Sequence, residues 1–76
     1  MKMWKEKTWQ YEITGVDGNT SLFGVNIFDY QWNFIKSEAT KERTIDIYSV
    51  VIDDVEHVFG AREASNCVWE FYLFKY

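Results

Sequence analysis

Residues 44–60 constrain the fold of this chain most, because their long run rich in apolar residues contains no glycine, proline or asparagine before its end. The run reads TIDIYSVVIDDVEHVFG. Its many isoleucines and valines favour a strand, since β-branched side chains fit a pleated surface. Its spacing favours a helix. At about 100° per residue, almost all of its apolar side chains fall within one arc of the helical wheel.

We therefore expect an amphipathic helix over residues 44–59. A strand made of the same residues would carry apolar side chains on both faces, and it would be long for a small domain. Thr40 and Thr44 are candidate N-caps, as is Ser37, and Gly60 is a suitable residue to follow the last turn. These candidate capping residues support the prediction of a helix.

The rest of the chain reads as short strands joined by turns. Apolar and polar residues alternate, and Asp-Gly, Asn and Gly separate the runs. We expect strands at 7–14, 21–29, 33–38 and 66–76, a turn at 15–19 and a loop at 61–66. The predicted fold class is α+β: a small antiparallel sheet in the order β-β-β-α-β, with one amphipathic helix packed on one face. The alternative is a mostly-β five-stranded meander, with a strand over 44–52 and a short helix from Asp53.

Chain length and aromatic content together predict one small domain with rings at its surface. The chain has 76 residues and fifteen Trp, Tyr and Phe side chains, but one cysteine and one histidine. Each large ring buries about 150–250 Å², which is more apolar area than so small a core can hide. Trp and Tyr are enriched at interface hot spots. We expect a surface that binds a partner, or forms a homodimer, to include Trp9, Tyr11, Trp32 and Trp69.

Charge is unevenly distributed along the chain. The net charge is −4, yet the first eleven residues carry +2 and residues 12–74 carry −7. On the expected helix, several carboxylates would form an acidic stripe opposite the apolar face. These residues are Glu42, Asp46, Asp53, Asp54 and Glu56. Such a stripe can steer a basic protein partner, whereas an acidic body disfavours direct binding of nucleic acid.

The sequence gives little support for catalysis. His57 and Asp53 are four residues apart and can face one ion on a helix, but no third ligand converges on them. Cys67 begins a strand expected to be central, where a buried cysteine behaves as a small hydrophobe. The chain has no glycine-rich phosphate loop. We therefore expect no enzyme activity, no metal and no cofactor.

Cellular context follows from the same features. The longest apolar runs are too short to span a bilayer, so we expect no membrane association. A lone cysteine and the lack of a targeting segment fit the cytoplasm.

These observations predict a non-enzymatic, acidic protein-interaction module. We expect it to act as a small inhibitor of the type found in phages and mobile elements. Such an inhibitor would dock on the basic, nucleic-acid-binding surface of a larger protein. Two alternatives remain: a small-ligand domain that stacks a sugar or an aromatic ring, and a structural homo-oligomer.

Overall fold

The structure, a computed structural model, describes residues 8–75. Nearly all of its regular structure is strand, and residues 8–75 contain no α-helix. The strands are β1 (Thr8–Val16), β2 (Ser21–Leu22), β3 (Val25–Asn26), β4 (Asn33–Ala39), β5 (Thr44–Ile52), β6 (Val55–Ser65) and β7 (Val68–Lys75), with one 3₁₀ turn, η1 (Ile27–Asp29).

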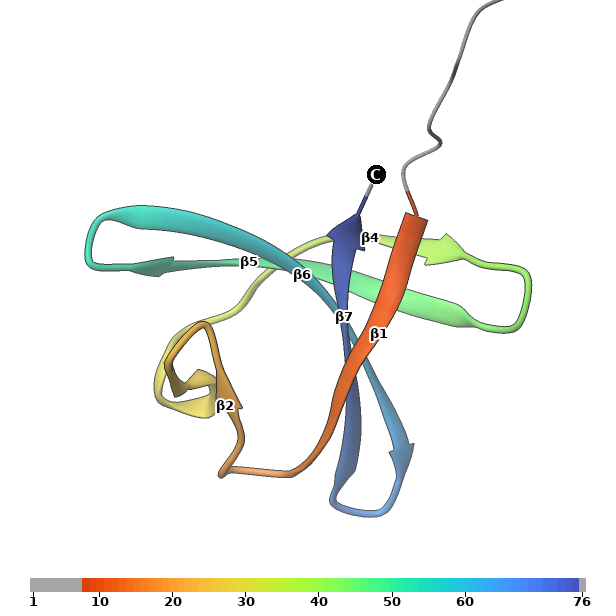
Figure 1. The fold of residues 1–76 in the computed structure, drawn as a ribbon, viewed down its shortest axis with the longest axis horizontal. Coiled ribbons are helices and arrows are strands. Elements are labelled where there is room, and N and C mark those ends of the chain that lie inside the picture. Colours follow the sequence, from red (N-terminus) through yellow and green to blue (C-terminus); the bar gives the residue numbers. More distant parts are fainter. Residues whose placement is uncertain (1–7, 76) are drawn as a thin grey trace, which may run out of the picture.

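Five of these strands form one antiparallel sheet in the order β1-β7-β6-β5-β4. Strands β4 to β7 follow one another as hairpins, and β1 pairs with β7, so the first and last strands of the chain are neighbours. In Figure 1, β4 and β5 run across the picture while β7 and β1 run down it. The sheet is therefore strongly twisted. Strands β2 and β3 form a separate short hairpin.

The predicted helix over residues 44–59, and with it the α+β fold class, is wrong. These residues form β5 and the start of β6, joined by a two-residue turn at Asp53 and Asp54 with φ of 52° and 67°. β5 lies between β4 and β6 and is covered on both faces. A strand buried on both faces loses the clean alternation that would have identified it. Gly60 lies inside β6 and ends no helix.

Two other expected elements also differ. The expected strand at 21–29 is broken by a tight turn at Phe23 and Gly24, where φ is 57° and 81°, and it continues into η1. The expected loop at 61–66 is mostly strand, because β6 continues to Ser65 and pairs with β7. Both corrections reflect long-range pairing and packing, which local residue patterns do not reveal.

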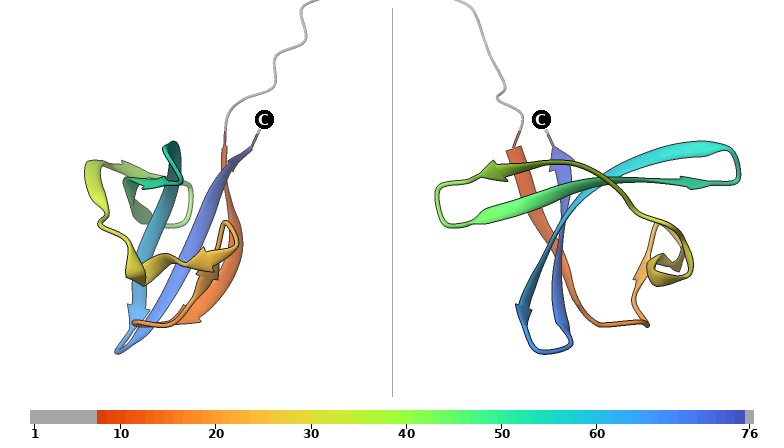
Figure 2. Two further views of the ribbon diagram at one scale, coloured as in Figure 1. Left: turned by 90° about the vertical axis from the view of Figure 1, so that its left-hand side faces the viewer. Right: turned by 180° about the vertical axis from the view of Figure 1, so that it is seen from behind.

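The main core lies on one face of the sheet, beneath residues 17–32. Phe59 and Phe71 come from the sheet and Leu22 and Ile27 from the covering segment, and all four are buried. Figure 2 shows the β2–β3 hairpin and η1 lying against the sheet. Gly15 permits the close approach, because a Cβ atom there would lie 2.1 Å from Oγ1 of Thr20. This face is the interior of the domain.

The opposite face carries a second, smaller cluster. Ile45, Ile47 and Tyr72 are buried there, and Trp9 packs against them. Gly60 lies in the middle, where an added Cβ would be 2.8 Å from Cδ1 of Ile45 and 3.5 Å from Cε3 of Trp9. Because Gly60 has no side chain, Trp9 can pack closely against this face of the sheet. This packing positions the candidate site.

Candidate binding cleft

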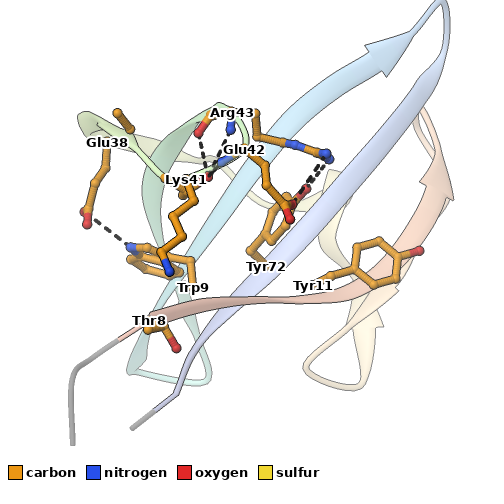
Figure 3. A pocket seen from close by; sticks show the side chains of 10 residues that line it. Thr8, Trp9, Tyr11, Glu38, Lys41, Glu42, Arg43 and Tyr72 are labelled. Atoms are coloured by element: carbon orange, nitrogen blue, oxygen red, sulfur yellow. Dashed lines mark hydrogen bonds and ion pairs between the residues drawn. The ribbon is translucent and has the colours of Figure 1, made fainter.

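A cleft of about 570 Å³ opens on the second face, where the ends of β1 and β4 approach each other. Figure 3 shows its side chains, drawn from β1, β4, the β4–β5 loop and β7. They are Thr8, Trp9, Tyr11, Glu38, Ala39, Thr40, Lys41, Glu42, Arg43 and Tyr72. We call this site the aromatic cleft. Its volume is about twice that of a shallow hollow of about 290 Å³ beside Trp32 and Trp69.

Trp9 joins the two edge strands of the sheet across the cleft. Its ring stacks on Phe74 with centroids 4.5 Å apart and planes 12° from parallel. Its Nε1–H donates a hydrogen bond of 3.3 Å to Oε1 of Glu38 in β4. Glu38 also pairs with Lys36 at 3.7 Å. Trp9 is thus held on both sides and serves as a wall of the cleft.

Tyr11 presents the most accessible ring in the cleft. It is 55% exposed and contacts Tyr72 edge-to-face, with centroids 6.0 Å apart. Its hydroxyl shares a hydrogen bond with the hydroxyl of Thr14. An aromatic ring fixed at its far end but open on its face can pack against a ligand with little loss of conformational entropy.

The hydroxyl of Thr40 organises the loop that carries the cleft's cations. It accepts hydrogen bonds from the backbone N–H groups of Glu42 at 3.2 Å and Arg43 at 3.1 Å, and it donates to the carbonyl of Arg43 at 2.7 Å. The backbone N–H of Thr40 donates to the same carbonyl at 2.7 Å. Such local side-chain bonds fix a loop that has no ladder partner. Lys41 extends from this loop over the cleft (Figure 3).

Arg43 is held in place by Tyr72 and Glu70. Its Nη1 donates to the Tyr72 hydroxyl and to Oε1 of Glu70, both at 3.0 Å, and the Tyr72 hydroxyl donates to the same carboxylate at 2.9 Å. Arg62 approaches that oxygen at 3.6 Å, and its buried Nη1 has no hydrogen-bond partner within residues 8–75. Two guanidinium groups therefore share one carboxylate.

This network shifts two pKa values. The hydrogen bond to the Tyr72 hydroxyl, with the nearby Glu70 carboxylate, raises the pKa of Arg43. Burial raises the pKa of Tyr72, and its hydrogen bond to Glu70 adds to the shift. Arg43 stays charged and Tyr72 stays neutral at physiological pH.

Four of the five lysines and arginines of residues 8–75 line the aromatic cleft or bond to its acidic partners. Two line the cleft, two bond to its acidic partners, and one pairs with Thr8 across β1 and β7. The five are Lys36, Lys41, Arg43, Arg62 and Lys75. Three carboxylates, Glu38, Glu42 and Glu70, line the cleft or bond to its residues, so the four cations and three anions of this network leave +1 there.

The remaining carboxylates of residues 8–75 lie elsewhere and have no lysine or arginine bonded to them. They are Glu12, Asp17, Asp29, Asp46, Asp53, Asp54, Glu56 and Glu63, a charge of −8. The structure therefore places most cations at the cleft and most carboxylates on the rest of the domain. The net charge of the chain does not reveal this separation.

The five predicted acidic residues do not share one stripe, because the helix that would align them is absent. Glu42 lies at the aromatic cleft, while Asp53 and Asp54 form the turn at the other end of β5. The nine residues of β5 span about 30 Å at about 3.3 Å per residue. Asp46 lies between them and accepts a hydrogen bond from Ser37 at 2.6 Å. Glu56 faces Val51 near the turn.

The four predicted aromatic residues divide between the two faces of the sheet. Trp9 and Tyr11 line the aromatic cleft. Trp32 and Trp69 belong to the cluster around the main core, with ring centroids 5.4 Å apart, and Trp32 donates to the carbonyl of Ile27 at 2.9 Å. A shallow hollow of about 290 Å³ remains beside them.

Sequence reasoning missed the contributions of Lys41, Arg43 and Glu70. The available signal was the expected β7 alternation, which places Glu70 and Tyr72 on one face. The pairing of Tyr72 with Tyr11 could not be read from the chain, because it joins strands at opposite ends of the sequence.

The structure also shows where the two candidate reactive residues, Cys67 and His57, lie. Cys67 is exposed in the β6–β7 turn with φ of 63°, so the prediction that it is buried in a strand is wrong. His57 stacks against Phe23 at 4.5 Å. No group of three or more His, Cys, Asp or Glu side chains within residues 8–75 is placed to hold a metal ion.

Comparisons with protein-family models, with curated proteins and with solved structures found no match for this chain. Within residues 8–75, no helix has the length and apolar character needed to cross a membrane.

Proposed function

We propose that this domain is a non-enzymatic protein-interaction module and that the aromatic cleft is its binding site. One observation carries the proposal: four of the five lysines and arginines of residues 8–75 line the cleft or bond to its acidic partners, and the cleft also holds the exposed ring of Tyr11. Exposed aromatic rings beside fixed cations are typical of surfaces that bind proteins. The site therefore replaces the acidic stripe as the leading candidate.

The ligand that fits this site is an acidic protein segment with apolar side chains. Tyr11 offers a ring face for an apolar side chain, while Lys41 and Arg43 offer charge-assisted hydrogen bonds to carboxylates. Arg43 is already oriented by Tyr72 and Glu70, so binding orders little more of its side chain. Glu38 is engaged by Trp9 and Lys36, which limits its repulsion of an acidic ligand.

A second candidate surface keeps part of the original hypothesis of an acidic module. Residues 51–58, which we call the acidic hairpin, include Asp53, Asp54 and Glu56. Val51, Val55 and Val58 are exposed beside them, at 52%, 54% and 41%. Carboxylates next to exposed apolar side chains suit docking on a basic surface of a larger protein.

A fluorescence anisotropy titration tests the proposed site. The probe is a labelled synthetic peptide of alternating glutamate and valine, and its matched control replaces each glutamate with lysine. We expect the acidic probe alone to bind, with affinity falling as salt rises. Lys41→Glu and Tyr11→Ser should each weaken binding about tenfold, which corresponds to about 1.4 kcal/mol. Glu63→Gln, an exposed change outside both the cleft and the acidic hairpin, should leave affinity unchanged.

Three outcomes would contradict the proposal. The acidic probe could fail to bind, it could bind equally well to the Lys41→Glu variant, or the lysine control could bind as tightly. The last result would instead favour the acidic hairpin as the working surface.

A further inference from the structure

The acidic hairpin and the aromatic cleft lie at opposite ends of the molecule. In Figure 1 the β5–β6 turn lies at one end of the long axis and the β4–β5 loop at the other. Strand β5 connects them over about 30 Å. A hairpin with a two-residue turn is too short to fold back across that distance, so it cannot reach the cleft of its own chain.

The two ends are complementary in charge and in apolar surface. The acidic hairpin carries three carboxylates and no lysine or arginine, whereas the cleft and the residues bonded to it carry four cations and three carboxylates, a net +1. The hairpin exposes Val51, Val55 and Val58, and the cleft exposes the ring of Tyr11. This is the ligand chemistry that the proposed function assigns to the cleft, displayed on the same chain.

We propose that the acidic hairpin of one copy docks in the aromatic cleft of a second copy, so that the chain self-associates head to tail. The inference rests on the proposed function, because it names the partner of the same cleft. Each copy keeps a free hairpin at one end and a free cleft at the other. A head-to-tail contact of this kind adds further copies until a ring closes or a filament grows.

The sheet edges offer a poorer route to self-association. The edges are β1 and β4, and each carries a register shift, between Tyr11 and Ile13 in β1 and between Phe34 and Lys36 in β4. Irregularities and lysines on edge strands discourage pairing with another sheet. The hairpin-to-cleft contact needs no such pairing, since it joins side chains on exposed surfaces.

Two variants separate the two halves of the contact. The hairpin-blocked variant carries Asp53→Asn, Asp54→Gly and Glu56→Gln, which remove three charges while Asn-Gly suits the tight turn. The cleft-blocked variant carries Lys41→Glu and Tyr11→Ser at exposed positions of the cleft. Circular dichroism of each variant verifies that the sheet is intact before any mixing.

Sedimentation velocity on the full chain measures the assembly. In about 0.01 M salt, where charges act over about 30 Å, the wild-type mass should rise with concentration beyond twice 9.1 kDa. Each variant alone should remain at 9.1 kDa. An equal mixture of the two should form a pair and stop there, because only one hairpin and one cleft are intact. Salt of about 1 M should dissociate the wild type.

The opposite results overturn the inference. A wild type that stays monomeric at every concentration, variants that still associate alone, or a mixture that stays monomeric each rule out the head-to-tail contact. The acidic-peptide titration distinguishes this failure from failure of the proposed function. A monomeric protein that still binds the acidic probe retains the cleft as a binding site but has a different partner.

Discussion

The two ends of β5 differ in how they are built. At the acidic hairpin, a two-residue turn connects the strands, and its carboxylates make no side-chain hydrogen bond or ion pair within residues 8–75. At the aromatic cleft, Thr40 organises the loop, and Arg43, Glu70 and Tyr72 bond to one another. The first end is held by its backbone, and the second by its side chains. Side-chain mutations should therefore affect the two ends differently.

The largest expected effect comes from crowding the cluster beneath Trp9. Gly60→Val places side-chain atoms where Ile45 would lie 2.8 Å away and beneath Trp9. Overpacking of this kind should lower the free energy of unfolding by about 2–3 kcal/mol. Urea denaturation measures the loss. The control is Gly18→Ala, whose φ of 86° is strained but whose added Cβ meets nothing within 4 Å. Equal losses in both variants would show that crowding beneath Trp9 contributes nothing.

The next effect should come from the loop. Thr40→Val removes the hydroxyl that makes three hydrogen bonds with the backbone of residues 42–43. We expect a loss of about 1–2 kcal/mol in the free energy of unfolding, together with weaker binding of the acidic peptide. Thr40→Ser keeps the hydroxyl and should retain both properties. Full binding by Thr40→Val would show that the loop needs no side-chain support.

The hairpin end should respond in the opposite direction. Replacing Asp53-Asp54 with Asn-Gly keeps the left-handed turn and removes its conformational cost, since both residues have positive φ. The free energy of unfolding should rise by about 1 kcal/mol. The midpoint of urea denaturation measures the gain. Cys67→Gly, in the β6–β7 turn where φ is 63°, provides a comparison. A loss of stability would mean that the aspartates support the hairpin through their side chains.

The smallest effect should be a pH dependence of the cleft end. Burial and the bond to Glu70 raise the folded-state pKa of Tyr72 above its ordinary value of 10.0. A raised pKa contributes stability that is present below pH 10 and is lost as the pH rises through the folded-state value. The free energy of unfolding should therefore decrease above pH 10, and this decrease with pH should be less steep in Tyr72→Phe.

The control for this pH effect is Tyr48→Phe. Burial, followed by the charge of Asp46, also raises the pKa of Tyr48, so this variant should remove a separate part of the decrease. Unfolding by urea at several alkaline pH values, with tyrosinate absorbance as a second signal, measures both. If the free energy of unfolding fell with pH as steeply in Tyr72→Phe as in the wild type, the hydrogen-bond network of Arg43, Glu70 and Tyr72 would be contradicted.

Parts of the fold were predictable, from local alternation in the edge strands and from a dense run of aromatic residues in the interior strand β7. Strands expected at 7–14 and 33–38 correspond to β1 and β4, and the aromatic run at 66–76 corresponds to β7. β5 was mistaken for a helix because it is buried on both faces and its turn uses two aspartates. Aspartate tolerates the left-handed region more readily than most residues, so that turn carried a weak signal that was missed.

The cleft was only partly predictable, because it depends on contacts between distant residues. Trp9 and Tyr11 were expected at a binding surface from their ring type and position in the sequence. The bond from Trp9 to Glu38 spans 29 residues, and the bond from Arg43 to Tyr72 also spans 29. The sheet order that creates both contacts pairs the first strand with the last. Local periodicity contains no information on such pairing.

The most direct test of the account is to map where an acidic ligand binds. The hairpin-blocked variant, isotope-labelled and free of self-association, is titrated with the glutamate–valine peptide and followed by the chemical shifts of its backbone amides. We expect the shifts to concentrate at Tyr11, Lys41, Arg43 and Tyr72 and to leave residues 51–58 unchanged. Absence of shifts at the cleft, or shifts concentrated at residues 51–58, would contradict this expectation.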